Sequence, residues 1–291
     1  MSRRSAVPYV LLVPGMLLLS VFLIVPSIYG FWLSLHEFDG INLGAWSGLG
    51  QYQAVLADPE FRRSLWHTVE FAIVVVIGKN AVGLALAVLV SAPLKGARLA
   101  RTLLFLPVTM NVIVVGAFWT FFLSARRFGG LFNEMLNSVG LGMLETSWLS
   151  SEQTALVSVA AVEIWRWAGL HMLLFLAGMQ VIEPQLYDAG RMDGANAWVR
   201  FWHITVPQLG PVLSVSILLA LMGAFVRSFD VVWVLTRGGF GTDVVVTHMY
   251  NEAFQFSRFG RAAAMGYVLF AIIAIITFTF VLISRRKLRD V

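Results

Sequence analysis

The chain contains no cysteine and few charged residues. Without cysteine among its 291 residues, disulfides, thiolate metal sites and cysteine nucleophiles are excluded. Charged residues make up 13% of the sequence and hydrophobic residues 58%, whereas a soluble domain carries roughly 25% charge. This composition predicts a chain that folds in a lipid solvent.

The motifs of common enzymes are missing as well. The sequence has no P-loop, no GxGxxG, no GxSxG and no HExxH pair. Its histidines are scattered, without the spacing of a zinc site, at His36, His67, His171, His203 and His248. We therefore expect a protein that is not an enzyme, with no catalytic residue, no metal site and no cofactor bound by this chain.

Long apolar runs recur along the sequence, and a spanning helix needs ~20 such residues. A helix is the expected form because backbone amides in hydrocarbon must be satisfied within the segment. The sequence predicts an all-α polytopic membrane protein with six transmembrane helices, over residues 9–33, 68–90, 102–123, 154–181, 211–235 and 262–283.

Three regions are expected along the chain. Residues 1–67 would hold the first helix and an outer segment, residues 68–284 the main transmembrane module, and residues 285–291 a basic cytoplasmic tail. The first apolar stretch is longer than the core of a signal peptide and no small-residue cleavage site follows it, so an uncleaved helix is predicted.

The distribution of Lys and Arg predicts the orientation. With the N-terminus inside, eleven of the 21 basic residues fall on the inner side, among them the Arg3-Arg4 pair and Lys95, and seven fall on the outer side, among them Arg126-Arg127. This bias agrees with the positive-inside rule. Both termini and the loop between spans four and five are therefore expected in the cytoplasm.

That loop, residues 183–211, is a polar island between two apolar runs. Pro184 suits the first position of a helix, and residues 185–192 can form two turns. Gly194 tolerates a positive φ, and residues 196–203 can form a second short helix before Pro207 and Pro211 interrupt the pattern. A unit of this size cannot bury a core alone. Its apolar residues must therefore pack on the membrane helices or on a partner.

The residues of this island resemble the EAA loop of ABC-importer permeases, most closely the carbohydrate-uptake branch that includes the maltose and glycerol-3-phosphate inner-membrane permeases. The matching residues are Tyr187-Asp188-Ala189-Gly190, Asp193-Gly194-Ala195, Trp198, Phe201, Ile204 and Pro207. Phe105-Leu106-Pro107, Phe229-Asp230 and Gly238-Gly239 also fit the family pattern, and the resemblance extends over nearly the whole chain.

The resemblance implies a permease subunit that imports a sugar or related polyol by alternating access. Its partners would be a second permease, two ATPase subunits that carry ATP and Mg²⁺, and an extracytoplasmic solute-binding protein facing outer loops 36–67, 124–153 and 236–261. No nucleic acid is expected, and the location would be the bacterial cytoplasmic (inner) membrane.

In such a permease the island is the coupling element for the ATPase. Asp188 would meet the ATPase, Gly194 would allow the turn, and Phe201, Ile204 and Pro207 would fix the loop to its own bundle. The sequence departs from the family where Asp188 replaces Glu and Gly190 replaces Ala, a change expected to loosen the first helix by ~1 kcal/mol. Phe240 also stands where Pro commonly follows the glycine pair.

Charged residues inside spans are functional candidates because lipid disfavours them. Spacing suggests that Glu163 pairs with Arg166 and Arg227 with Asp230, and that Lys79 makes a helix–helix contact. A candidate substrate path follows one stripe on each of spans four and five, at Glu163, Trp167, Leu170, Leu221, Phe225 and Ser228. Packing of helices is the alternative reading of the same stripes.

Two other functions stay open. A self-sufficient secondary transporter would be expected to show inverted repeats and broken helices in matching halves, and no such repeat is visible. A membrane-embedded transferase would need a cluster of acids or histidines at one membrane face. The one cytoplasmic acid cluster, Glu183, Asp188 and Asp193, lies in the docking motif.

Overall fold

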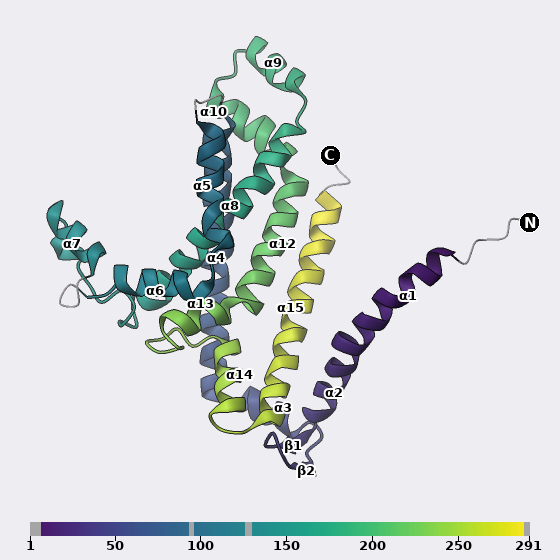
Figure 1. The fold of residues 1–291 in the computed structure, drawn as a ribbon. Coiled ribbons are helices and arrows are strands. Elements are labelled where there is room, and N and C mark those ends of the chain that lie inside the picture. The colour runs from purple at the N-terminus through teal and green to yellow at the C-terminus, as the bar shows by residue number, and fades with distance from the viewer. Residues whose placement is uncertain (1–6, 93–95, 126–129, 288–291) are drawn as a thin grey trace, which may run out of the picture. The chain divides into compact units, whose positions relative to one another are not determined.

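The structure is a computed structural model that describes residues 7–92, 96–125 and 130–287 (Figure 1). Three sets of basic residues used to predict orientation, Arg3-Arg4, Lys95 and Arg126-Arg127, lie outside the described residues. So do the last four residues of the predicted basic tail. The chain divides into two compact units, residues 1–62 with 248–272 and residues 63–247 with 273–291.

The first unit begins with a long helix and a short hairpin. Helices α1 (Val7–Leu19) and α2 (Val25–Leu33) are joined by a π-helical turn, Ser20–Ile24, and are followed by antiparallel strands β1 (His36–Phe38) and β2 (Leu43–Trp46). Helix α3 (Gly50–Ala57) and parts of α4 (Pro59–Ser91), α14 (Val245–Phe254) and α15 (Phe259–Lys287) complete it.

Contacts inside this unit join α15 to α14, to the start of α4 and to the first helix. Arg261 donates a hydrogen bond to the carboxylate of Asp58, and its Nε lies 3.7 Å from Glu252. The Tyr267 hydroxyl donates to the carbonyl of Ser27. The Tyr267 contact joins the first helix to α15, although no residue in the apolar window of the first helix is buried.

The second unit is a helical bundle. It contains most of α4, the C-terminal end of α15, and the following further helices: α5 (Ala97–Thr109), α6 (Val112–Phe122), α7 (Leu131–Ser138), α8 (Ala155–Gln180), α9 (Pro184–Met192), α10 (Ala197–Arg200), α11 (Val206–Gln208), α12 (Gly210–Val226) and α13 (Ser228–Leu235). A 3₁₀ turn, Gly142–Leu144, and a π-helical turn, Phe201–Thr205, join some of these helices.

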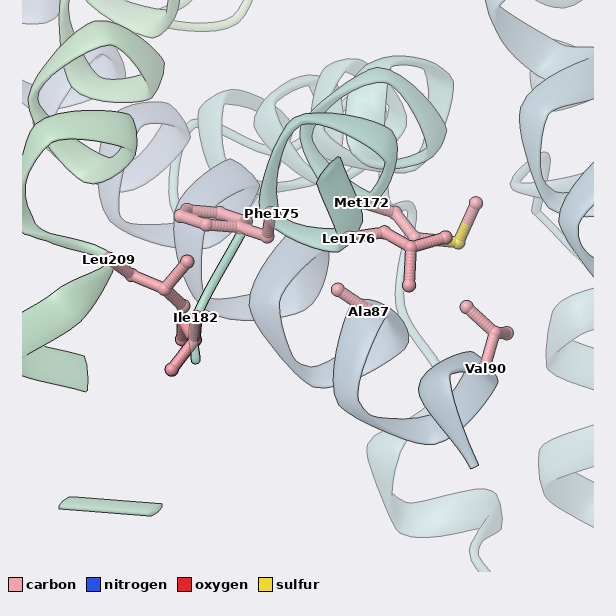
Figure 2. Packing of buried hydrophobic residues seen from close by; sticks show 7 residues of the cluster. All are labelled: Ala87, Val90, Met172, Phe175, Leu176, Ile182 and Leu209. Carbon is pink, nitrogen blue, oxygen red and sulfur yellow. The ribbon is translucent and has the colours of Figure 1, made fainter. Parts of the chain in front are cut away.

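A cluster of buried apolar side chains holds α4, α8 and the chain around the polar island together. Figure 2 shows Met172 and Leu176 of α8 beside Ala87 and Val90 of α4, while Phe175 lies toward Ile182 and Leu209. All seven side chains are at most 9% exposed. Removing such area from water stabilises a fold by roughly 25 cal/mol per Å². The cluster therefore fixes both ends of the island to the membrane helices.

Four helices of the described chain are long and apolar enough to cross a membrane, and the number rises to 6 if each bent helix pair is one span. These four match the predicted spans one, two, four and six. Helix α4 begins at Pro59, nine residues before the predicted start at residue 68. The structure thus confirms a mostly helical membrane protein with four to six spans.

The predicted third span is wrong as a continuous helix. Helices α5 and α6 meet at a bend of 100°. Met110 is extended (ψ 141°), and the side chain of Asn111 accepts a 2.9 Å hydrogen bond from the backbone N–H of Ile113. The asparagine cap starts a new helix, and the extended backbone at Met110 separates it from the preceding one. The sequence prediction did not include this interruption, because Asn111 lies in an otherwise apolar run.

The predicted fifth span is also interrupted. Helix α12 ends at Val226, Arg227 takes a non-helical conformation (φ −96°, ψ 1°), and α13 begins at Ser228. The predicted interruption before this span is confirmed, because helices 197–208 and 210–226 meet at a bend of 69° just after Pro207. The π-helical turn 201–205 precedes Pro207 and continues into α11. A π-helical turn also precedes Pro26 in the first helix. Proline has no N–H to donate, and the wider turn accommodates it.

Candidate functional site

The polar island forms a compact helical projection at one end of the long helices of its unit (Figure 1). Pro184 occupies the first turn of α9, as predicted. The side chain of Asn196 accepts a 2.9 Å hydrogen bond from the N–H of Val199 and so starts α10. Between the two helices Gly194 has φ 77°, a value that side chains with a Cβ rarely adopt. The predicted turn at Gly194 is confirmed.

Hydrogen bonds close the island on itself. The N–H of Ala195 donates to the carbonyl of Gly190 at 2.9 Å, and Arg200 Nη1 donates to the carbonyl of Ala195 at 2.6 Å. The hydroxyls of Tyr187 and Thr205 are 3.0 Å apart and join α9 to the π-helical turn. The backbone of the turn is therefore satisfied without a partner protein.

Apolar contacts seat the island on the bundle. Ile204 and Tyr187 pack against the buried cluster of α4 and α8, and Thr205 is buried. A Cβ at Gly190 would lie 3.1 Å from Ile204 Cδ1. Gly190 therefore allows α9 to approach the second helix closely, which is a packing reason for the residue that the sequence alone did not show.

The rest of the island faces outward. Asp188, Ala189, Asp193 and Pro207 are exposed, and Phe201 is half-buried. Asp188 is paired with Arg191 at 2.9 Å, and both side chains are about two-thirds exposed, at 67% and 64%. Apolar side chains beside them are also exposed, Met192 at 89% and Trp198 at 69%. Exposed apolar surface rimmed by charge is typical of a protein-binding face.

The second group of candidate residues lies inside the bundle. Lys79 of α4 and Glu163 of α8 form a 2.7 Å ion pair with side-chain exposures of 1% and 2%. The helix–helix contact predicted for Lys79 is confirmed. The predicted pair of Glu163 and Arg166 is wrong, because Glu163 forms its ion pair with Lys79 on a different helix.

Three cationic side chains lie around the ring of Trp167. The guanidinium carbon of Arg227 lies 4.3 Å from the ring centroid, and Lys79 Nζ and the guanidinium carbon of Arg166 each lie 5.6 Å from it. All three are within the range of a cation–π interaction. We call Lys79, Glu163, Arg166, Trp167 and Arg227 the charge cluster. Arg227 contacts Trp167 and forms no ion pair with Asp230 among the described residues, so that predicted pair is also wrong.

The remaining residues of the predicted substrate path have different surroundings. Phe225 and Ser228 are buried, and Leu170 and Leu221 are half-buried. The structure thus brings Glu163 and Trp167 together with basic residues that the stripe did not include. No residue spacing within one helix could have revealed the partner on α4. A role of the six residues in a path stays a prediction.

A further polar contact joins α8 to α12 near the charge cluster. His171 Nδ1 and Ser216 Oγ are 2.7 Å apart, and the two side chains are 2% and 0% exposed. Among the described residues, no group of three or more His, Cys, Asp or Glu could hold a metal ion. The ion pair, the cation–π contacts and this hydrogen bond can position side chains and bind polar groups.

Comparison with known proteins gives one consistent family. Residues 79–289 match the model of the binding-protein-dependent transport system inner membrane component. The chain is 32% identical to the inner membrane ABC transporter permease protein YcjO of Escherichia coli, over 98% of this chain and 96% of that protein. It is 30% identical to the trehalose/maltose transport system permease protein MalF of Thermococcus litoralis, over 97% of this chain and 95% of that protein.

The fold has a close counterpart among solved structures. A chain of a bacterial ABC transporter involved in the import of the acidic polysaccharide alginate superposes with a TM-score of 0.84, at 24% identity, and covers 98% of this chain and 96% of that chain. At this identity the likeness establishes the fold.

Proposed function

This chain belongs to the family of binding-protein-dependent transport system inner membrane components, and we propose that it is the permease subunit of an ATP-driven importer of carbohydrates. The observation that carries the proposal is the island. A self-satisfied helical turn is seated on the bundle by Ile204 and presents Asp188 to the solvent. The names of relatives that transport trehalose, maltose and starch degradation products support a sugar or related polyol as the substrate.

In this proposal the chain has six spans, the third formed by α5 and α6 and the fifth by α12 and α13. Both termini and the island lie on the cytoplasmic side of a bacterial inner membrane, as the positive-inside rule predicts. Two ATPase subunits bind below the island and supply ATP and Mg²⁺, a second permease completes the path, and a solute-binding protein docks on the opposite side. Since the chain has none of the nucleotide-binding motifs, ATP hydrolysis is assigned to the partner chains.

The island is suited to transmit motion. The buried cluster holds Ile182, which directly precedes the island, and Leu209 near its end, and α12 follows directly. A rigid lever joined to a helix can convert closure of an ATPase dimer into a rigid-body movement of that helix. The break at Arg227 then allows α12 to move with a different amplitude from α13.

Reconstitution tests the proposal. The chain is expected to co-purify with an ATPase, and proteoliposomes with the solute-binding protein and ATP are expected to accumulate a carbohydrate. Asp188→Lys or Gly194→Pro should abolish ATP-driven uptake. Arg98→Gln, an exposed change on α5 outside the island, is the matched control and should retain it. Uptake that needs only an ion gradient would contradict the proposal and favour a secondary transporter.

A further inference from the structure

The charge cluster carries more positive than negative charge inside the bundle. Three cations surround the Trp167 ring, and the one carboxylate among them, Glu163, is engaged with Lys79 at 2.7 Å. Arg166 and Arg227 feel the field of Glu163 but form no ion pair with a described residue. The neutralised pair leaves two guanidinium groups without a carboxylate partner.

The two halves of the charge cluster differ in their exposure to solvent. Lys79 and Glu163 are each 1% exposed, whereas Arg227 is exposed and Arg166 and Trp167 are half-buried. The compensated pair thus lies inside the bundle, and the uncompensated cations lie on its open side. Cations in spanning segments face a bundle interior or a water-filled cavity rather than lipid. This side of the unit is therefore expected to line an aqueous path.

The backbone around Arg227 is arranged to hold its side chain there. Arg227 lies at the break between α12 and α13, and irregular backbone at membrane depth is tolerated where it lines a cavity. A Cβ at Gly223 would lie 3.1 Å from Arg227 Nη2 and 3.4 Å from Lys79 Nζ. The absence of a side chain at Gly223 lets both cations approach α12, while Trp167 orients the guanidinium.

Free donors complete the arrangement. Arg166 Nε and Ser228 Oγ are buried and form no hydrogen bond with the described residues. A guanidinium group binds carboxylate or phosphate oxygens through paired N–H donors. We propose that Arg166 and Arg227 form a recognition site for an anionic group, a carboxylate or a phosphate, on the transported carbohydrate. The inference rests on the proposed function, and it specifies the substrate as an acidic sugar.

Direct binding to the assembled importer tests this site. The probes are matched pairs of acidic and neutral trisaccharides built from the same hexose, in the gluco, manno and galacto series, together with the corresponding hexose phosphates. Binding is measured by calorimetry on the detergent-solubilised complex without the solute-binding protein, so that the permease alone determines the preference. At least one acidic member is expected to bind about tenfold more tightly than its neutral partner, the size of one charge-assisted hydrogen bond. The trisaccharide and phosphate arms separate a carboxylate from a phosphate ligand.

Variants of the cluster assign the preference to named residues. Arg166→Gln and Arg227→Gln should each weaken binding of the acidic ligand about tenfold and leave the neutral ligand unchanged. Arg227→Lys keeps the charge and should retain part of the preference, which separates recognition from misfolding. Arg98→Gln removes one exposed positive charge elsewhere and should have no effect.

Three outcomes would overturn the inference. They are tighter binding of every neutral member, binding of no probe at all, and an acidic preference that survives in both glutamine variants. Dissociation of the permease pair in Arg227→Gln, with ligand preference intact, would instead assign the arginines to a carboxylate of the second permease. Failure of the proposed function is distinguishable, because the complex would then lack an ATPase or ATP-dependent uptake altogether.

Discussion

Two ion pairs of the second unit, Lys79–Glu163 and Asp188–Arg191, have almost the same length, 2.7 and 2.9 Å, in opposite surroundings. The side chains of the first pair are 1% and 2% exposed, and those of the second are 64% and 67% exposed. A buried pair is balanced against the desolvation of both charges, so loss of one partner is severe. An exposed pair contributes about 0–1 kcal/mol because water screens it. The first therefore holds helices together, whereas the second leaves a carboxylate available to another protein.

The largest effect is expected from loss of one member of the buried pair. Glu163→Met leaves Lys79 buried without its partner and should lower the free energy of unfolding by about 3–5 kcal/mol. Thermal unfolding of the detergent-solubilised complex measures this. The double variant Lys79→Met with Glu163→Met removes both charges and should recover most of the loss. A double variant as unstable as the single one would contradict the role given to the pair.

An intermediate effect is expected at the turn of the island. Gly194 has φ 77° with nothing within 4 Å of an added Cβ, so conformation rather than space limits this position. Gly194→Val should destabilise the turn by about 1–2 kcal/mol and reduce ATP-driven uptake. Gly194→Asn is the matched control, since asparagine tolerates positive φ, and it should remain close to wild type. Equal behaviour of the two variants would show that the turn is not conformationally constrained.

The exposed pair should affect function more than stability. Asp188→Asn should change the free energy of unfolding by less than about 1 kcal/mol and should weaken association with the ATPase. Arg191→Gln removes the same ion pair but keeps the carboxylate. Co-purified ATPase should therefore fall further in Asp188→Asn than in Arg191→Gln. Equal losses in the two variants would assign the effect to the ion pair itself.

The smallest effect concerns a third carboxylate, which is exposed like Asp188 but bound by neutral groups. Asp39 accepts hydrogen bonds from the N–H groups of Asn42 at 2.6 Å and Ile41 at 2.9 Å, and these hydrogen bonds lower its pKa. Because the pKa is lowered on folding, the ionised carboxylate of Asp39 stabilises the folded hairpin at pH values above its pKa in the unfolded chain, about 3.9. This stabilisation is lost as the pH falls through the pKa of the folded state.

The hairpin around Asp39 should therefore keep its protection from hydrogen exchange down to about pH 4 and lose it below. Asp39→Asn should show no such dependence on pH. Loss of protection on raising the pH would contradict the assignment.

Prediction from the sequence succeeded where one segment determines the outcome. The runs of apolar residues gave the helical class and four complete spans, and Pro184 and Gly194 marked the start and the turn of the island. These features depend on local rules for proline, glycine and hydrophobic length.

The errors arose where distant residues meet. Glu163 was assigned to Arg166 three residues away, but Lys79, which belongs to another helix, is its partner. Likewise, the approach of Gly190 to Ile204 became visible only when the island folded on the bundle. The breaks at Asn111 and Arg227 show that a single polar residue can interrupt an apolar run, an effect that hydropathy averages out.

Cross-linking of the island tests the central claim most directly. Because the chain has no cysteine, a single introduced cysteine reports one position only. In the assembled complex, Asp188→Cys is expected to form a cross-link to the ATPase chain, whereas Leu144→Cys, an exposed position on a predicted outer loop, should not. A cross-link to the ATPase from residue 144, or none from residue 188 in a complex that contains the ATPase, would contradict the account.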